Sequence, residues 1–192
     1  MIRETIVTTV NADGTVQIAP MGVRARDDLI IIAPFRPSTT LDNLTRSGTA
    51  VINMTDDVRI FAGCLTGRYD WPTVPATMIE GRRLRDPLSH SEVEVMRLEE
   101  DDTRPRFFCE VRHQETHRPF QGFNRAQHAI LEAAILVSRL HLLPADKIDT
   151  ELKYLQIVVD KTAGVTEREA WDWLLARITE FRRERAPGET LA

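Results

Sequence analysis

The chain has 192 residues, of which 42% are hydrophobic and 28% charged, which fits one globular domain or one domain with a small appendage. Its net charge of -4 and its pI near 5.8 exclude a general electrostatic attraction to nucleic acid or to an anionic membrane surface. No apolar run approaches the ~20 residues that cross a bilayer. The charged start of the chain and its two distant cysteines lead us to expect a cytoplasmic protein without a disulfide framework.

The first part of the chain is predicted to form β-strands. Residues 4–10 are rich in β-branched side chains, and residues 15–19 resume that pattern after the turn signal of residues 11–14, so a hairpin is expected. The second strand runs into Pro20-Met21-Gly22. Proline there cannot donate a hydrogen bond to a neighbouring strand, and glycine lets another backbone or a ligand approach closely. We expect this strand to be interrupted or exposed at its edge, so that a flat ligand could lie against its main chain. A buried strand follows over residues 29–35.

The segment from Arg36 to Asn53 has the features of a seat for a phosphate group. Ser38 or Thr39 is the expected N-cap of a short helix, and a helix N-terminus attracts phosphate through its unpaired N–H groups and its dipole. The hydroxyl groups of Ser38, Thr39 and Thr40 would add donors, as would the guanidinium of Arg36. We predict that this segment holds the phosphate end of a cofactor. The alternative interpretation is structural: the hydroxyls only cap a helix, and Asn53 only ends a strand over residues 48–53.

The middle of the chain is predicted to add a short helix and further strands. Residues 58–65 fit an amphipathic helix that residues 55–57 cap, and the loop of residues 67–75, with Tyr69 and Trp71, is a candidate substrate lid. Strand patterns then return, and the last two of them surround a polar turn and predict a second hairpin. The expected strands are 77–79, the region of Leu84, 92–98 and 106–113.

From residue 119 onward the pattern becomes helical. The expected helices cover residues 123–143, 145–161 and 166–184, and Thr166 with Glu169 forms a capping box for the third helix. The sequence therefore predicts an α+β protein, in which an antiparallel sheet of about six or more strands closes into a small barrel and a C-terminal three-helix appendage follows. We divide it into a barrel domain of residues 1–118 and a helical tail of residues 119–192.

The order of these segments resembles the FMN-binding split-barrel superfamily, which includes flavin reductases and proteins like pyridoxamine-phosphate oxidase. The matching motifs of the barrel are Asn11-Ala12-Asp13-Gly14, Ile18-Ala19-Pro20-Met21-Gly22, Ser38-Thr39-Thr40 followed by Asn43, and Ala50-Val51-Ile52-Asn53. Within that superfamily the chain is most similar to an uncharacterised family of split barrels with a C-terminal helical tail. The matching motifs of the tail are Phe123-Asn124-Arg125-Ala126, Glu132-Ala133-Ala134-Ile135, Arg139-Leu140 and Lys161-Thr162-Ala163-Gly164.

The resemblance implies that FMN is the cofactor and that the protein is a homodimer, with the helical tail packed on the barrel or on the partner. It implies that the main chain of residues 20–22 lies along the isoalloxazine ring and that Asn43 and Asn53 bind the ribityl chain or the ring edge, since an amide both donates and accepts. Flavin reductases commonly place more positive charge at the phosphate, and Arg68 or Arg125 would supply it here. The expected cofactor-binding residues are Pro20, Met21, Gly22, Arg36, Ser38, Thr39, Thr40, Asn43 and Asn53.

The function implied by the resemblance is an FMN-dependent oxidoreductase of the flavin-reductase type, whose substrate is unknown and whose electron donor is NAD(P)H or another small redox molecule. The alternative is a non-catalytic protein that binds or stores FMN. No residue is singled out as a general acid or base, so the catalytic residues stay unassigned and the chemistry would be that of the flavin.

Other candidate sites have simpler structural explanations. His113 and His117 have a spacing seen in metal sites, but no third ligand is evident, so we expect no metal. Asp56 and Asp57 stand at a helix start, where carboxylates complement the helix dipole. Cys64 is expected to be a small core residue.

Overall fold

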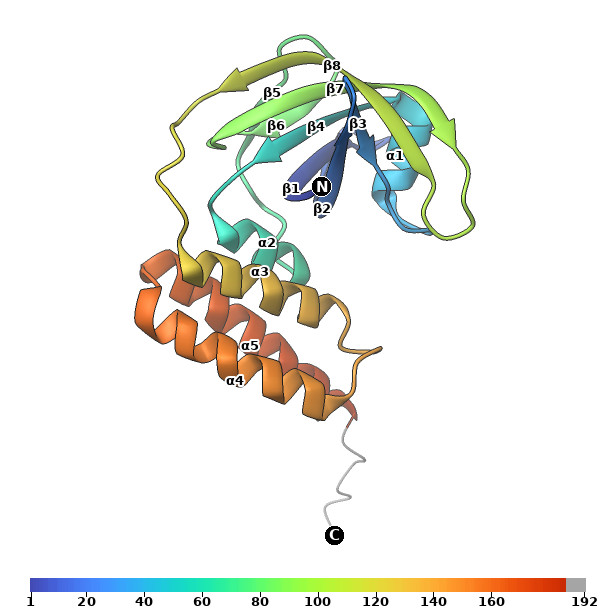
Figure 1. Ribbon diagram of the computed structural model, residues 1–192. Helices are drawn as coiled ribbons and strands as arrows, with labels where there is room; N and C mark the ends of the chain where they lie inside the picture. The colour runs from blue at the N-terminus through green and yellow to red at the C-terminus, as the bar shows by residue number, and fades with distance from the viewer. Residues whose placement is uncertain (186–192) are drawn as a thin grey trace. The chain divides into compact units, whose positions relative to one another are not determined.

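The computed structural model describes residues 1–185 (Figure 1), and the end of the predicted helical tail, residues 186–192, lies outside the described residues. The chain forms two compact units. Among the described residues, the barrel unit consists of residues 1–56 and 69–121, and the helical unit consists of residues 57–68 and 122–185. No helix among the described residues is long and apolar enough to cross a membrane.

Six antiparallel strands close into the predicted barrel, in the order β1-β2-β3-β8-β7-β4. These strands are β1 (Ile2–Val10), β2 (Val16–Arg26), β3 (Leu29–Ile32), β4 (Thr49–Met54), β7 (Ser89–Glu99) and β8 (Arg106–Thr116). Two short strands, β5 (Thr73–Pro75) and β6 (Arg82–Leu84), pair with each other in a separate sheet. The predicted barrel and the two predicted hairpins are therefore confirmed.

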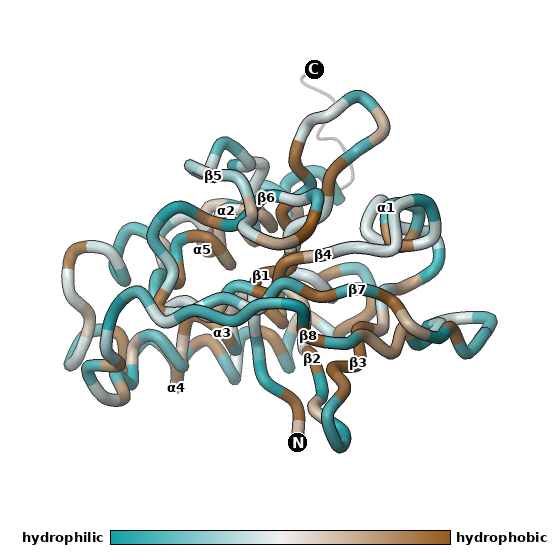
Figure 2. The backbone as a smooth tube through the Cα atoms, turned by 90° about the horizontal axis from the view of Figure 1, so that it is seen from above, coloured by the Kyte–Doolittle hydropathy of each residue, from teal (hydrophilic) through white to brown (hydrophobic). Residues whose placement is uncertain are grey.

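The interior of the barrel is filled by alternate side chains of its strands. Val7, Ile52 and Phe107 belong to one buried cluster, which Leu41 and Leu44 of helix α1 (Thr39–Ser47) join. Because strand side chains alternate between two faces, the opposite positions are left for the polar groups described below. Figure 2 shows how hydrophilic β8 is over much of its length.

Strand β2 continues through Pro20 without a break, so of the two predicted possibilities, an interrupted strand or an exposed edge, the exposed edge is the one observed. Its pairing explains why proline is tolerated: β1 pairs with residues 16–24, whereas β3 pairs only with residues 24–26. On the side of β3, residues 16–23 have no ladder partner among the described strands, which is the predicted edge exposure. Because no strand accepts a hydrogen bond there, the N–H that Pro20 lacks is not needed. A Cβ on Gly22 would lie 2.7 Å from Cγ2 of Ile2, so the glycine also makes room for this diagonal neighbour on β1.

Two further predicted strands differ from the structure. Residues 77–79 form a loop, because their N–H groups bind a buried carboxylate and not a neighbouring strand. Strand β3 ends at Ile32 and does not reach residue 35.

The helical unit has an almost entirely apolar core. Its helices are α2 (Val58–Leu65), α3 (Arg125–Ser138), α4 (Ala145–Thr162) and α5 (Val165–Arg185). Trp171 and Leu174 of α5 belong to the same buried cluster as Val58 and Ala62 of α2. Helix α2 is thus part of this unit, whereas the predicted domain division at residue 118 places it with the barrel.

The start of α5 differs from the predicted capping box. The N–H of Gly164 donates to Oε2 of Glu167 at 3.0 Å, two residues earlier than the expected pair of Thr166 and Glu169. Glu169 instead lies 3.5 Å from the guanidinium of Arg59. The first helix of the predicted tail also ends earlier than expected, at Ser138.

Candidate functional site

The N-terminus of α1 has the predicted capping geometry. Ser38 is the N-cap, with an extended backbone (φ -161°, ψ 149°), and its hydroxyl accepts a hydrogen bond from the N–H of Leu41 at 3.3 Å. Ser38 is half-buried and Thr39 is exposed, whereas Thr40 is buried. The first N–H groups of a helix have no partner within the helix, so this terminus can present them, with the Ser38 and Thr39 hydroxyls, to an anion.

Asn43 is buried and connects α1 to the end of β1. Its amide nitrogen donates to Oγ1 of Thr9 at 3.0 Å and to Oδ1 of Asn11 at 2.7 Å. Its amide oxygen accepts a hydrogen bond from Arg46 at 3.3 Å. Within the chain, the nitrogen of the Asn43 amide therefore holds the helix against the barrel, and its oxygen binds a residue of the same helix.

Arg36 is turned toward the loop between β7 and β8. Its guanidinium forms an ion pair with Glu100 and donates to the carbonyl of Asp101 at 3.2 Å. The Arg36 side chain is 42% exposed. An ion pair at such an exposed position contributes little to stability, about 0–1 kcal/mol, so Arg36 can exchange this partner for another anion.

Pro20 and Asn53 lie on one row of the sheet, because both pair with Ile6 of β1, from either side. Asn53 is fully buried. Its amide nitrogen donates to the carbonyl of Ile6 at 3.0 Å, and its amide oxygen accepts the N–H of Leu84 at 2.8 Å. Asn53 thus attaches β6 to the barrel wall, while the carbonyl of Met21 accepts the hydroxyl of Thr5 at 2.9 Å.

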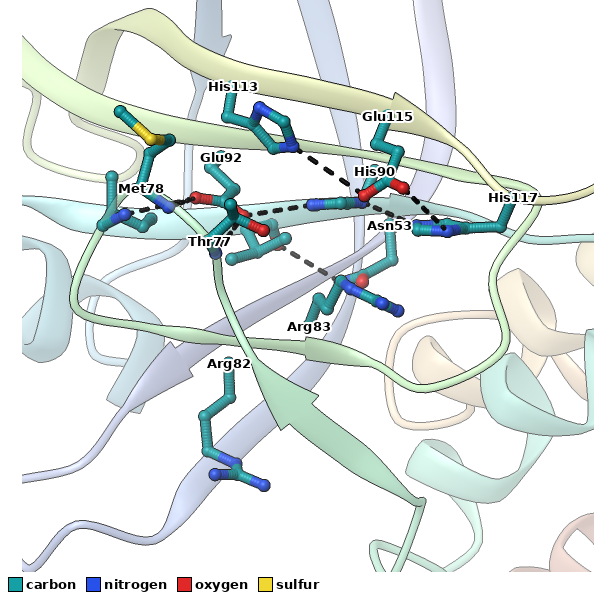
Figure 3. A network of polar contacts seen from close by, with 12 residues as sticks. Asn53, Thr77, Met78, Arg82, Arg83, His90, Glu92, His113, Glu115 and His117 are labelled. Carbon is teal, nitrogen blue, oxygen red and sulfur yellow. Dashed lines mark hydrogen bonds and ion pairs between the residues drawn. The ribbon is translucent and has the colours of Figure 1, made fainter.

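A buried carboxylate that the sequence analysis did not identify lies on the same face of the barrel (Figure 3). Glu92 of β7 is fully buried and accepts N–H groups from three consecutive residues of one loop. The distances are 2.6 Å from Thr77, 2.6 Å from Met78 and 3.2 Å from Ile79. Burial alone would raise the pKa of Glu92, but these N–H groups and His90 outweigh it and hold the pKa below its ordinary value. Glu92 is therefore an ionised carboxylate that fixes the loop of residues 76–81.

His90 connects this carboxylate to a second histidine. Its Nε2 lies 3.1 Å from Oε1 of Glu92, and its Nδ1 lies 2.9 Å from Nε2 of His117. Burial lowers the pKa of His90 more than its hydrogen bond to Glu92 raises it, which favours the neutral imidazole. Because a carboxylate only accepts hydrogen bonds, the single proton of His90 is assigned to Nε2, and Nδ1 keeps its lone pair.

His113 and Glu115 of β8 extend the same group of side chains. Nε2 of His113 is buried and has no hydrogen-bond partner, and it lies 3.8 Å from Oε2 of Glu115. The donor atoms of His90, His113 and Glu115 all lie within 4.8 Å of one another. Figure 3 shows the three side chains converging from the two neighbouring strands.

A β-bulge explains why these residues share a face. Val93 pairs with Val111, but Glu92 pairs with His113, so Arg112 is an extra residue in β8. Strict alternation from the interior residue Val111 would place His113 inside the barrel, and the bulge turns it to the face of Glu92. The sequence signals were present, in the H-x-E of residues 90–92 and the H-x-E-x-H of residues 113–117, but only the hairpin register brings them together.

Comparison with known families gives two matches. A family model described as the N-terminal domain of a protein of unknown function (DUF447) matches residues 3–118, and a second model, described as a protein of unknown function (DUF447), matches residues 124–176. No curated protein is similar to the chain in sequence.

Solved structures share the fold. An FMN-bound DUF447 protein from Methanosarcina mazei has a TM-score of 0.79 at 17% identity, over 92% of this chain and 94% of that one. The 2-nitrobenzoate 2-nitroreductase of Pseudomonas fluorescens has a TM-score of 0.51 at 23% identity, over 59% of this chain and 64% of that one. Flavoredoxin of Desulfovibrio vulgaris has a TM-score of 0.52 at 14% identity, over 60% and 70%. The first likeness spans both units, and the predicted split barrel is confirmed.

Proposed function

The chain belongs to the DUF447 family of proteins of unknown function, and we propose that it binds FMN and acts as a flavin-dependent oxidoreductase on a small redox substrate. Support comes from the likeness, over nearly the whole length of both chains, to an FMN-bound member of the family. The structure adds the observation that carries the proposal: the Ser38-capped N-terminus of α1 presents hydroxyl and N–H donors at the surface of the barrel unit.

We assign the FMN phosphate to this helix N-terminus. The half-buried hydroxyl of Ser38, the exposed hydroxyl of Thr39 and the first N–H groups of α1 are donors of the kind that phosphate accepts. Arg36 would add a positive charge by exchanging Glu100 for the phosphate. Thr40 is buried behind these residues and would position them.

We assign the isoalloxazine ring to the open edge of β2. On that edge the main chain of residues 20–22 has no ladder partner among the described strands, so those of its polar groups that face this edge, other than the Met21 carbonyl that accepts the Thr5 hydroxyl, are available to a flat ring. Asn43 and Asn53 stay predicted as cofactor ligands. Within the chain the amide of Asn43 holds α1 against β1 and that of Asn53 holds β6 against the barrel, so a bound cofactor would share or replace some of these hydrogen bonds.

When bound, FMN supplies hydride or single-electron transfer, and the residues of the chain bind it and orient it. We further propose that NAD(P)H or another small donor reduces it and that the protein works as a homodimer, as the resemblance to split barrels implies. A protein that only stores FMN would use the same residues. Steady-state oxidation of NADH and NADPH by the FMN-loaded protein separates the two functions, since a storage protein shows no turnover.

The first test is the visible absorption spectrum of the purified protein, with the mass of the released chromophore. Flavin bands and the mass of FMN support the proposal. A colourless protein that stays colourless after incubation with FMN and dialysis contradicts it.

The phosphate assignment is tested by comparing FMN with riboflavin, which lacks the phosphate. Ser38→Asp keeps a good N-cap, because aspartate and serine cap helices about equally well, but it places a negative charge at the proposed phosphate. We expect the affinity for FMN to fall at least tenfold and that for riboflavin to change little. Thr45→Asp, an exposed position on the same helix, adds the same charge away from the N-terminus and serves as the control. Equal losses for both ligands in Ser38→Asp would refute the assignment.

A further inference from the structure

We propose that the face of the β7–β8 hairpin that carries His90, His113 and Glu115 binds a divalent transition-metal ion of the zinc class. The residues of this site differ from those assigned to FMN, although His90 pairs with Asn53 across strands β7 and β4. Two imidazoles and a carboxylate are a donor set that suits such ions, whereas Mg²⁺ and Ca²⁺ prefer sites built of oxygen atoms alone.

The orientation of His90 is the first argument. Its Nε2–H is held by Glu92 at 3.1 Å, and three loop N–H groups hold Glu92 in turn. A carboxylate that binds one ring nitrogen of a histidine is the usual support of a metal-binding imidazole, since it fixes the tautomer and leaves the other nitrogen as the ligand. Nδ1 of His90 is therefore a lone pair at a fixed position on the side of His117.

The unpaired nitrogen of His113 is the second argument. Nε2 of His113 is buried and lacks a hydrogen-bond partner, which costs free energy unless another group binds it. The Arg112 bulge aims this nitrogen to the same face as His90. A metal ion would satisfy it.

The distances are the third argument. Two ligands about 2.0–2.1 Å from a tetrahedral ion are about 3.4 Å apart. The separation of 3.8 Å between Nε2 of His113 and Oε2 of Glu115 is close to this value. With His90 included, the donor atoms of all three residues lie within 4.8 Å of one another. The Glu115 side chain is 50% exposed, so it can move the remaining fraction of an ångström and gives the ion a path from solvent.

His117 is the nearest further donor. Its Nε2 is 2.9 Å from Nδ1 of His90, a distance at which one proton now joins the two nitrogens. An ion bound by His90 would displace that proton from Nε2 of His117, which can carry it on Nδ1 instead, and Nε2 of His117 would then be free to join the coordination sphere. His117 therefore completes a set of three imidazoles and one carboxylate.

The experiment uses the tag-free, full-length chain, dialysed against a chelator and then against metal-free buffer. Zn²⁺ is titrated by calorimetry, and Co²⁺ is titrated by visible absorption, because its ligand-field bands report tetrahedral nitrogen and oxygen ligands. We expect one ion per chain, an increase in the thermal midpoint with Zn²⁺, and Co²⁺ bands of tetrahedral intensity.

Four variants assign the site. His113→Ala and Glu115→Gln are the main ones, because both side chains are partly exposed and their loss should leave the fold intact, as circular dichroism can verify. Each should weaken Zn²⁺ binding at least tenfold. Glu92→Gln, which acts through His90, should weaken binding by about 10–100-fold and alter the Co²⁺ spectrum. His128→Ala, an exposed histidine of α3, is the matched control and should bind as the wild type does.

The absence of Zn²⁺ uptake overturns the proposal. So does uptake that stays the same in both His113→Ala and Glu115→Gln, since the ion would then bind elsewhere. Flavin absorbance is recorded in the same samples, so the outcome for the metal is independent of the outcome for FMN.

Discussion

The two units of the molecule bury very different groups. Among the described residues, the barrel unit buries a series of polar side chains, whereas the helical unit buries one, Glu167, which caps α5. The buried polar residues of the barrel are Thr5, Thr8, Thr9, Thr40, Asn43, Asn53, His90, Ser91 and Glu92. A buried polar group is tolerated where neighbouring groups satisfy it, and it then fixes a particular arrangement. The helical unit therefore depends on apolar packing, and the barrel depends on apolar packing and on specific hydrogen bonds.

One buried cysteine in each unit allows the two to be followed separately. Cys109 lies in the barrel unit and Cys64 in the helical unit, and burial raises the pKa of each thiol to about 12. A thiol reagent at pH 8 reacts with the thiolate, so each cysteine should react only when its own unit opens. Peptide mass spectrometry after labelling then gives one opening rate for each unit.

The largest expected effect concerns the helical unit. Trp171→Ala removes a fully buried side chain, together with its hydrogen bond of 2.9 Å to Gln156. We expect a loss of about 3–5 kcal/mol in the free energy of unfolding. The labelling of Cys64 should accelerate at least a hundredfold and that of Cys109 much less. Tyr154→Ala, at an aromatic side chain that is 68% exposed, is the control. Equal acceleration of both cysteines would mean that the two units unfold together.

The second prediction concerns the barrel. Glu92→Gln keeps the shape of the side chain but replaces one acceptor oxygen by a donor, which faces the loop N–H groups of residues 77–79. We expect the free energy of unfolding to fall by about 3 kcal/mol, because at least one buried N–H is left without an acceptor. Cys109 labelling should accelerate, and Cys64 labelling should not. Glu94→Gln, which changes an exposed glutamate of the same strand, should cost less than about 1 kcal/mol. If the two variants are equally stable, Glu92 is not needed to hold the loop.

A smaller effect is expected at Asn53. Asn53→Ala leaves the N–H of Leu84 without its acceptor and removes the link between β4 and β6. We expect the free energy of unfolding to fall by about 2 kcal/mol. Amide hydrogen exchange should accelerate at residues 82–84. Asn53→Asp keeps the acceptor but turns an oxygen toward the carbonyl of Ile6 in place of the donor, so, once exchange is corrected for the global stability of each variant, it should protect the N–H of Leu84 better than alanine does. Similar exchange in both variants would argue against this hydrogen bond.

The smallest effect is a loss of stability at alkaline pH. The ordinary thiol pKa is 9.0, and both cysteines have a folded-state pKa of about 12. Above pH 9 the unfolded chain loses protons that the folded chain keeps, so stability present below pH 9 is lost as the pH rises toward 12. At pH 10 we expect each thiol to lower the free energy of unfolding by about 1 kcal/mol. The loss is measured as the decrease in the urea midpoint between pH 8 and pH 10. Cys64→Ala and Cys109→Ala should each reduce this change, and an unaltered pH dependence would contradict it.

The sequence predicted those features that depend on local pattern. The β-branched and alternating runs indicated the barrel strands, and Ser38 was identified as a helix cap because capping depends on neighbouring residues. Features that depend on distant pairing were missed. The N–H groups of residues 77–79 bind a carboxylate thirteen to fifteen residues away, so this segment was taken for a strand.

The histidine cluster was missed for the same physical reason. His113 and His117 were noticed, but His90, which lies beside them, comes from the other strand of the hairpin. The bulge at Arg112 also reverses the alternation that a sequence pattern relies on. The cofactor assignment came from the resemblance to a family, and its individual residues stay predictions.

The passage of the chain through the two units has a consequence for protein engineering and for evolution by recombination. The chain enters the helical unit at residue 57, leaves it after residue 68, and enters it again at residue 122. A fragment that stops at residue 118 would carry α2 without α3 and α5, and would expose the apolar side chains of Val58 and Ala62 to water. The two family models therefore do not mark modules that can be exchanged with a single crossover. A working transplant of the helical unit would have to carry α2 along with the C-terminal helices, joined to the barrel at three points of the chain.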